Sequence, residues 1–446
     1  MKRRYYLLTT ALTLLLASCG TVQTPQGASS AAVLAPTVTA AHRLMTLSIQ
    51  PHTTREHLQA ALSDATILSF HPDTGSAVIA LDPARSTLTT AGLHPQALSE
   101  LGATVNAVEA NDHVAAETSE PDSLGLTTWA GGLTTWAGGL TTWAGGVSSL
   151  DSAAQTTYRK FLSRIGMSES YISTMPTQGA GVKVAVIDTG VDMNHPFLKT
   201  QISTTQGWDY VDNDALPQEV APVSGFGRYG HGTAVTGVLL QVAPKVTVLP
   251  YRVLGPDGSG TVAHLILAID RAVADGAKVI NLSLGLTSDS TALSTTLDTA
   301  LKAGVVIAAA AGNSNSTTLT YPARYATSGG LLSAPKFVGL VSVGSINLDG
   351  SKSAFSNYSG DLKMSAPGNA ILSAYPGGRL AYASGTSFAT PSVAAALALG
   401  MYRGTLTPGS LTDTLSTAGD SYSTLNVFTM GTMGRLLNVS RYLNAR

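Results

Sequence analysis

The chain has 446 residues, only 12% of them are charged, and the formal net charge is −1. A near-neutral chain without a basic tract lacks the positive surface that binds phosphates, so we expect no nucleic-acid partner. The length exceeds that of one typical core and predicts at least two domains.

The first segment has the pattern of an export signal. Basic residues near the N-terminus precede an apolar stretch from Leu7 to Ala17, which is too short to span a bilayer. The stretch ends in Leu16-Ala17-Ser18-Cys19, which resembles a bacterial lipoprotein box with Cys19 as the acylated residue. Cys19 is the only cysteine, so an internal disulfide is excluded.

We therefore predict a lipoprotein signal peptide at residues 1–18 and export to the bacterial cell envelope, with lipidated Cys19 tethering the precursor to the membrane. An ordinary secretory signal with a chance cysteine is the alternative. Residues 19–41 are rich in Thr, Ser, Ala, Gln and Pro and are predicted to be a flexible spacer.

Residues 42–117 have the pattern of a small α+β domain. The alternation of apolar residues predicts strands at 44–49, 66–70, 77–81 and 104–108, and helices at 53–62 and 95–101. A turn at 71–75 separates the second strand from the third. Taken alone, this domain could be an adaptor module of unknown role.

A repeat of period seven follows the α+β domain. Leu126-Thr127-Thr128-Trp129-Ala130-Gly131-Gly132 recurs as Leu133–Gly139 and as Leu140–Gly146. The paired glycines disfavour a helix by about 1 kcal/mol each, which argues against a coiled coil. We predict a flexible linker at 118–150, where a protease would cut readily; a segment that binds envelope or glycan surfaces is the alternative.

From residue 151 onward, apolar strands alternate with helices. The pattern predicts helices at 155–166, 262–274, 290–303 and 387–402, and strands at 183–187, 246–253, 279–284, 305–311 and 338–343. Buried strands that alternate with helices are typical of an α/β fold with a parallel sheet between helical layers. Ligands of such sheets bind at the carboxyl ends of the strands.

Three polar residues lie at the edges of these buried elements, each within two residues of a glycine. Asp188 ends an apolar run, His231 opens a helix, and Ser387 lies in the first turn of a helix that is apolar all round. Ser387 alone could be a helix cap. Together the three supply what acyl transfer needs: a nucleophile, a base, and a carboxylate that orients the imidazole.

The order Asp, His, Ser and the residues around each of them resemble the subtilisin-like serine proteases, or subtilases, from about Val182 to the C-terminus. The resemblance implies a serine endopeptidase at 151–446, with the triad Asp188, His231 and Ser387. It also implies that Asn313 is the oxyanion-hole residue. The chain departs from the family pattern at Phe388, where Met is common, and at Ala234, where His is usual.

The same resemblance implies an extended substrate that pairs with two glycine-containing segments. The substrate-binding residues it implies are Ser259, Gly260, Ser283, Leu284, Gly285, Ala311 and Gly312. Backbone pairing accepts any sequence, and Ser314 stands where some relatives carry an acidic residue. We expect protein or peptide substrates and a broad, mostly apolar preference.

Val105 to Glu117 resembles the end of subtilase propeptides. Residues 42–117 are therefore predicted to be a ferredoxin-like propeptide that assists folding and then inhibits the enzyme as its own partner. A cut between about Glu117 and Ser152 would separate the enzyme from its lipid anchor. The precursor would then be tethered and the mature protease free.

The family's usual calcium loop is not expected, because the chain runs from Leu240 to Pro244 without an insertion and Phe197 replaces an aspartate. We predict that no cofactor is required and no metal is bound. A secondary calcium site remains an alternative to a solvated acidic loop; its oxygen ligands would come from Asp209, Asp212, Asp214 and Glu219.

A second function fits the same fold. A catalytically inactive subtilase could bind peptides without cutting them. All four positions implied in catalysis are filled in this chain, which favours the enzyme. A serine-directed fluorophosphonate separates the two, because only an activated serine is labelled.

Overall fold

The computed structural model describes residues 34–82, 95–116, 126–127, 152–223, 228–326, 337–404, 407–421 and 432–445. The predicted signal peptide, Cys19 and the repeat beyond Thr127 lie outside these ranges. Within the described ranges, no helix combines the length and the apolar character needed to cross a membrane.

The N-terminal domain is an antiparallel sheet with two helices. Its elements are β1 (Arg43–Ser48), α1 (Arg55–Ala61), β2 (Ala65–His71), β3 (Ser76–Leu81), α2 (Pro95–Glu100) and β4 (Thr104–Ala110). The sheet order is β2-β3-β1-β4. It has an apolar core of its own, which includes Met45, Leu58 and Ile79. The predicted strands and helices of this domain are confirmed.

The second domain is built on an eight-stranded sheet in the order β18-β15-β14-β13-β11-β7-β9-β8, and its strand pairs are parallel. The strands are β7 (Lys183–Asp188), β8 (Trp208–Asp209), β9 (Thr247–Arg252), β11 (Val279–Leu282), β13 (Val306–Ala310), β14 (Leu340–Ile346), β15 (Met364–Pro367) and β18 (Arg435–Leu436). The predicted α/β class with a parallel sheet is confirmed.

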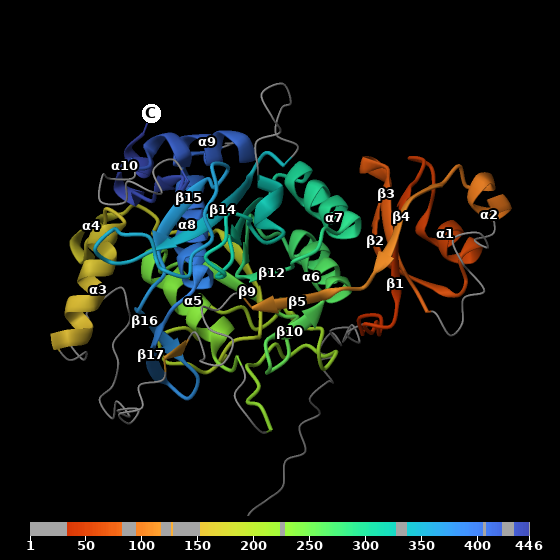
Figure 1. Cartoon of the computed structure of the whole chain (residues 1–446). Coiled ribbons are helices and arrows are strands. Elements are labelled where there is room, and N and C mark those ends of the chain that lie inside the picture. The colour runs from red at the N-terminus through yellow and green to blue at the C-terminus, as the bar shows by residue number, and fades with distance from the viewer. Residues whose placement is uncertain are drawn as a thin grey trace, which may run out of the picture. The chain divides into compact units, whose positions relative to one another are not determined.

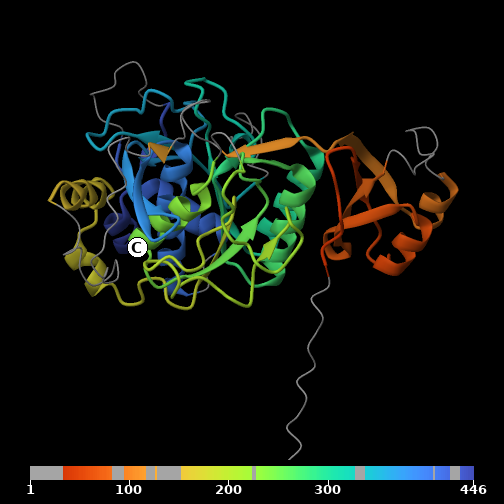
Figure 2. The same cartoon turned by 90° about the horizontal axis from the view of Figure 1, so that it is seen from below.

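Helices cover both faces of this sheet (Figure 1 and Figure 2). Helices α5 (His231–Val242) and α8 (Thr386–Gly400) share one apolar cluster with Val184 and Val186 of β7. Helices α6 (Val262–Ala274) and α7 (Thr291–Lys302) share another with Ala185 and Ile187. Because successive side chains of a strand point to opposite faces, β7 contributes to both cores.

Further helices and two paired strands belong to this domain. They are α3 (Ser152–Arg164), α4 (Glu169–Thr174), β16 (Ile371–Tyr375), β17 (Arg379–Ala383), α9 (Pro408–Ala418) and α10 (Val439–Asn444). β17 pairs with β16 and with β6 (Leu126–Thr127), which is the start of the first repeat unit. The backbone of the repeat's first residues therefore adds a strand to this small sheet.

One predicted strand is wrong in its extent. The apolar run 279–284 is not a single strand: β11 ends at Leu282, and β12 (Leu284–Gly285) belongs to a different, three-stranded sheet. The break falls at Ser283, whose carbonyl and hydroxyl both hydrogen bond to Ser387 of α8. The hydropathy pattern does not reveal this break between β11 and β12, because the residues on both sides of it are buried.

Candidate active site

Asp188 and His231 meet at the carboxyl end of β7. Asp188 is the last residue of this strand, and His231 is the first residue of α5. Asp188 Oδ1 lies 2.7 Å from His231 Nδ1, and the two side chains are 1% and 0% exposed. A carboxylate only accepts hydrogen bonds, so Nδ1 carries the proton. Nε2, which is buried without a hydrogen-bond partner, is left as the basic nitrogen.

Ser387 is the second residue of α8 and is fully buried. Pro391, one helical turn further on, has no backbone N–H and cannot bond to the Ser387 carbonyl. The Ser283 hydroxyl takes over this role and donates to that carbonyl at 2.8 Å. In return, the Ser387 hydroxyl donates to the Ser283 carbonyl at 3.0 Å. The sequence thus ties the candidate nucleophile to the residue between β11 and β12.

Asn313 follows β13 and has a fixed amide. Its Oδ1 accepts the backbone N–H of Thr386 at 2.8 Å, and the hydroxyl of Thr386 accepts the N–H of Gly312 at 3.2 Å. Asn313 Nδ2 is buried and has no hydrogen-bond partner. A buried, oriented donor without an acceptor is costly unless a ligand supplies one. The Asn313 side chain is thus held by Thr386, the residue directly before Ser387.

The comparisons with known proteins agree with this geometry. Residues 179–431 match the Subtilase family. The chain belongs to the subtilase family. It is 39% identical over 227 residues to "Thermitase" of Thermoactinomyces vulgaris, and the aligned region covers 49% of this chain and 74% of that protein. It is 36% identical over 234 residues to "Subtilisin amylosacchariticus" of Bacillus subtilis subsp. amylosacchariticus, and the aligned region covers 50% of this chain and 55% of that protein.

A solved structure is similar to this chain in its fold. The "Crystal structure of a cold adapted subtilisin-like serine proteinase" is 35% identical, covers 63% of this chain and 97% of that chain, and superposes with a TM-score of 0.52. The predicted family and enzyme class are confirmed, and this subtilase is a serine endopeptidase.

In this subtilase, Phe388 replaces the methionine common after the family's serine. Its ring centroid lies 5.2 Å from that of His231, with the planes at 56°. An aromatic ring at this distance restricts the imidazole from one side while the Asp188 carboxylate holds it from another. With Phe388 in place of methionine, His231 is therefore tightly packed. Ala234, the other departure, is fully buried inside α5.

A segment of the chain lies between the two glycine-containing strands and pairs with both. β5 (His113–Ala116) pairs antiparallel with β10 (Ser259–Thr261) and with β12 (Figure 1). Ala116 lies opposite Leu284, and Ala115 lies between Ser259 and Gly285. Four of the residues predicted to bind an extended peptide, Ser259, Gly260, Leu284 and Gly285, therefore pair with a peptide strand in this structure. Ser283 directly precedes β12, and Ala311 and Gly312 directly follow β13.

Two polar side chains just before β5 contact the starts of α6 and α7. The carboxylate of Glu109 accepts hydrogen bonds from the Ser290 hydroxyl (2.5 Å) and from the backbone N–H groups of Thr291 (2.9 Å) and Ala292 (3.2 Å). Asn111 Oδ1 accepts the N–H of Ala263 at 2.8 Å. Helix N-termini leave such N–H groups without partners, so both contacts are favourable.

These two residues were not predicted to have roles, although both lie in the stretch that resembles a propeptide end. Alternation in β4 was the available signal. It extends to Glu109, whereas β4 ends at Ala110, before Asn111, and the targets of both side chains on α6 and α7 are distant in sequence. Val114 of β5 was also missed; it is fully buried and joins the apolar cluster of α6 and α7.

The carboxylates considered for a secondary calcium site have protein partners. Asp209 and Asp212 both accept from Arg252 Nη1, at 2.6 and 2.5 Å. Glu219 is buried among hydroxyl and backbone donors, and Asp214 accepts the backbone N–H of Leu216 at 2.7 Å. In the described ranges, no group of three or more His, Cys, Asp or Glu side chains is arranged to hold a metal.

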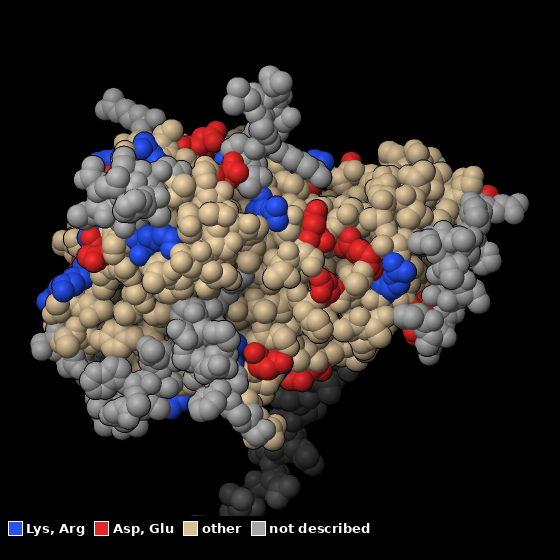
Figure 3. Space-filling view, viewed as in Figure 1, with Lys and Arg blue, Asp and Glu red and all other residues tan. Residues whose placement is uncertain are grey.

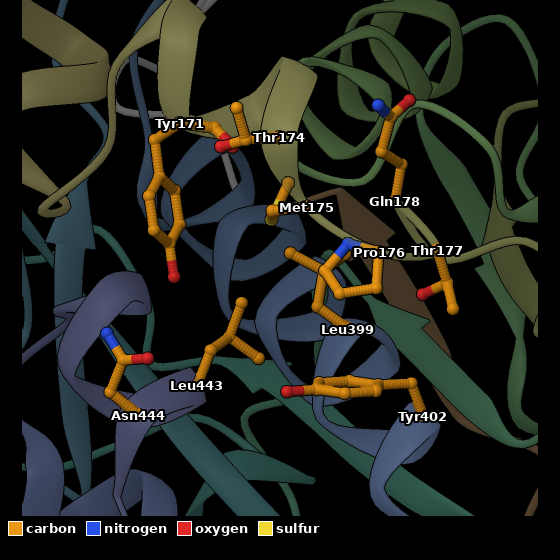
Figure 4. Close-up of a pocket in the computed structure, with 10 residues that line it drawn as sticks. All are labelled: Tyr171, Thr174, Met175, Pro176, Thr177, Gln178, Leu399, Tyr402, Leu443 and Asn444. Carbon is orange, nitrogen blue, oxygen red and sulfur yellow. The ribbon is translucent and has the colours of Figure 1, made fainter.

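A separate cavity of about 220 Å³ lies at the far end of α8 (Figure 4). α4, the end of α8 and α10 form it, with Tyr171, Leu399 and Leu443 among its lining residues. None of the lining residues is His, Asp, Glu, Lys or Arg. We do not assign it to the reaction, because Ser387 and Leu399 stand at opposite ends of the same helix.

Charged residues make up only 12% of the sequence. In Figure 3, Lys and Arg lie singly or in small groups among Asp and Glu, without a continuous basic band on the face shown. Nucleic-acid binding requires such a band. The face in view therefore gives no reason to revise the expectation that the partners are proteins and peptides.

Proposed function

We propose that this subtilase hydrolyses peptide bonds through an acyl-enzyme on Ser387. His231 Nε2 takes the hydroxyl proton and later gives it to the leaving amine, and Asp188 orients the ring and stabilises its charged form. The observation that carries the proposal is the buried 2.7 Å contact that leaves Nε2 as the basic nitrogen. The first step includes rotation of the Ser387 hydroxyl from the Ser283 carbonyl towards His231.

The oxyanion of the tetrahedral intermediate is held by Asn313 and by the backbone at the start of α8. The Asn313 amide is preorganised, because Thr386 fixes its oxygen and the amide nitrogen remains without a partner. The backbone N–H groups of a helix's first turn have no carbonyl partners within that helix, and the helix dipole favours a negative charge there. Preorganised donors of this kind lower the barrier without reorganisation during the reaction.

The substrate is an extended peptide that pairs with β10 and β12. β5 illustrates the mode: its backbone pairs with Ser259, Gly260, Leu284 and Gly285, and one side chain, Val114, is buried in the apolar cluster of α6 and α7. Backbone pairing supplies affinity for any sequence, and an apolar pocket supplies a mild preference. We therefore propose broad specificity with an apolar bias, measured with a peptide library. Exclusive cleavage after Lys or Arg would contradict it.

Residues 42–117 act as an inhibitory propeptide. Glu109 and Asn111 anchor the domain on α7 and α6, and β5 pairs with the strand edges that a substrate would use. Such a segment competes with substrate directly and also stabilises two helices of the enzyme. Both effects are those expected of a segment that assists folding and then inhibits.

The positions of two segments beside the active site support cleavage of the chain by its own active site. β5 ends at Ala116 opposite Leu284, which is next to Ser283. Beyond the undescribed residues, β6 pairs with β17, the strand that leads to Ser387. We propose that the maturation cut falls between these strands, shortly after Ala116. The cut releases the enzyme from a precursor that is exported and held by lipidated Cys19, to which one acyl chain gives about 0.8 kcal/mol per buried methylene.

A fluorophosphonate probe tests the enzymatic proposal. Matured enzyme is expected to be labelled once, on Ser387, with loss of activity, and the folded Ser387→Ala variant is expected to remain unlabelled. Absence of labelling in a folded, matured wild type would support the inactive peptide-binding scaffold instead.

A further inference from the structure

Glu219 is a buried carboxyl that contacts both segments of the Asp188–His231 pair. It lies in the chain between β8 and α5 and is 5% exposed. Its Oε1 accepts the Thr189 hydroxyl at 2.7 Å, and its Oε2 accepts the hydroxyl and the backbone N–H of Thr233 at 2.9 and 3.1 Å. Thr189 follows Asp188, and Thr233 lies in the first turn of α5. One carboxyl group therefore bridges the two elements.

The direction of these hydrogen bonds is fixed by a second set. The Thr189 hydroxyl oxygen accepts the N–H of Gly232 at 2.9 Å, and the Thr233 hydroxyl oxygen accepts the N–H of Asp192 at 2.9 Å. A hydroxyl that already accepts a backbone N–H is free to donate its single proton. Both threonines direct that proton to Glu219. The carboxyl is thus the common acceptor of a closed network across the two segments.

The two segments also lie in direct contact. A Cβ on Gly232 would come within 2.1 Å of the Gly190 carbonyl oxygen and 3.2 Å of the Asp188 Cβ. There is no layer of side chains between them that could adjust, so a shift of either segment changes the Asp188–His231 distance. The network around Glu219 is consequently placed to set that distance.

We propose that Glu219 is a positioning residue: through Thr189 and Thr233 it fixes the loop of Asp188 against the first turn of α5 and so holds His231 in its productive orientation. Glu219 itself touches neither the candidate nucleophile nor the substrate strand among its described contacts. The proposal deepens the proposed function and rests on it. Nothing about Glu219 requires a bound metal.

The pKa of Glu219 agrees with a role in orienting His231 rather than in stabilising the fold. Burial raises the pKa of Glu219 to about 8, against the hydrogen bonds from Thr189, Gly230 and Thr233, and the charge of Asp188 raises it further. Because Thr189 and Thr233 both donate to it, the network favours the charged form of Glu219, and burial of that charged form costs stability at neutral pH. A glutamine would avoid this cost and keep the shape, but its amide nitrogen cannot accept a hydrogen bond.

The first experiment compares Glu219→Gln and Glu219→Ala with the matched control Asp209→Asn. Asp209 is an equally buried carboxyl (2% exposed), held by Arg252 and by the backbone N–H groups of Val211 and Asp212. The full chain is expressed and matured, and rates are divided by the active sites titrated with the fluorophosphonate. We expect kcat to fall about 10-fold for glutamine and about 100-fold for alanine. KM should stay within about twofold of wild type.

The control separates orientation from general destabilisation. Asp209→Asn is expected to lower Tm and leave kcat within about twofold, whereas Glu219→Gln is expected to lower kcat with a Tm close to that of wild type. If Glu219→Gln and Glu219→Ala both keep kcat within about twofold, or if Asp209→Asn loses as much kcat as Glu219→Ala, the positioning role is refuted.

A second readout does not depend on catalysis. In the Ser387→Ala background, the Nδ1 proton of His231 gives an NMR resonance that reports its hydrogen bond to Asp188. Adding Glu219→Ala is expected to shift or broaden this resonance, and adding Asp209→Asn is expected to leave it unchanged. An unchanged resonance with Glu219→Ala would overturn the proposal. Failure of the proposed function would appear separately, as a wild type whose Ser387 is not labelled.

Discussion

Replacing Asn313 with alanine removes one specific part of the proposed machinery. The side chain makes one hydrogen bond in this structure, from the Thr386 N–H to Oδ1 at 2.8 Å, and its Nδ2 is buried without a partner. Alanine therefore deletes a structural acceptor and the proposed oxyanion donor together. The first loss affects stability, and the second affects only the transition state.

The two losses have different sizes. Leaving a buried backbone N–H without its acceptor costs about 1–3 kcal/mol of folding free energy. Removing a preorganised oxyanion donor costs about 2.7–4 kcal/mol in the barrier, which corresponds to about 10²–10³-fold in kcat; this magnitude comes from subtilisin, and we carry it over. We expect Asn313→Ala to show that fall in kcat with KM nearly unchanged, measured on a chromogenic peptide per titrated active site.

Asn313→Asp isolates the donor, because aspartate keeps an oxygen for Thr386 and has no N–H to offer. It is expected to retain more stability than Asn313→Ala and to lose at least as much kcat. The reasoning is wrong if Asn313→Asp turns over at the wild-type rate while Ser387→Ala is inactive. Asn313 would then be a structural residue only.

Three further predictions concern the N-terminal domain and calcium. Glu109→Ala should shorten the lag before activity appears in a purified precursor, because two helix N-terminal N–H groups lose their acceptor. The hydrogen bond to Asp270, 3.1 Å long, raises the pKa of His71 above its usual 6.5, so this contact is fully present below about pH 6.5 and is lost as the pH rises through the raised value. His71→Ala should therefore shorten the lag at acidic pH more than at alkaline pH, and an equal effect at both would refute the assignment. EDTA should leave Tm unchanged; a large decrease would reveal a calcium site.

The sequence was sufficient for the fold because its patterns are local. Val184–Ile187 is an uninterrupted buried run that ends in Asp188, and this is what a central parallel strand requires. Helix α6 begins and ends where its apolar spacing predicted, at Val262 and Ala274. The strand at 279–284 failed because its division depends on Ser387, more than a hundred residues away in the chain.

The sequence predicted the site residues whose type is dictated by the chemistry of the reaction. It did not predict the residues whose roles depend on tertiary contacts. Asp188, His231 and Asn313 stand at or just past element ends and within two residues of a glycine, a pattern visible in the sequence. Glu109 and Glu219 are single acidic residues with apolar neighbours, Val108 and Ala110 for the first and Val220 for the second. Their roles arise from donors supplied by helices and loops elsewhere, and Glu219 was considered only as a metal ligand. No local pattern distinguishes a buried acceptor from a solvated one.

The central claim is that Ser387, His231 and Asp188 form one working site that cuts this chain. Expressing wild type beside Ser387→Ala and sequencing the N-terminus of each product tests it directly. We predict a new N-terminus shortly after Ala116 in the wild type and an uncut junction in Ser387→Ala. Cleavage at the same position in a pure preparation of Ser387→Ala would show that the cut does not depend on this serine and would contradict the account.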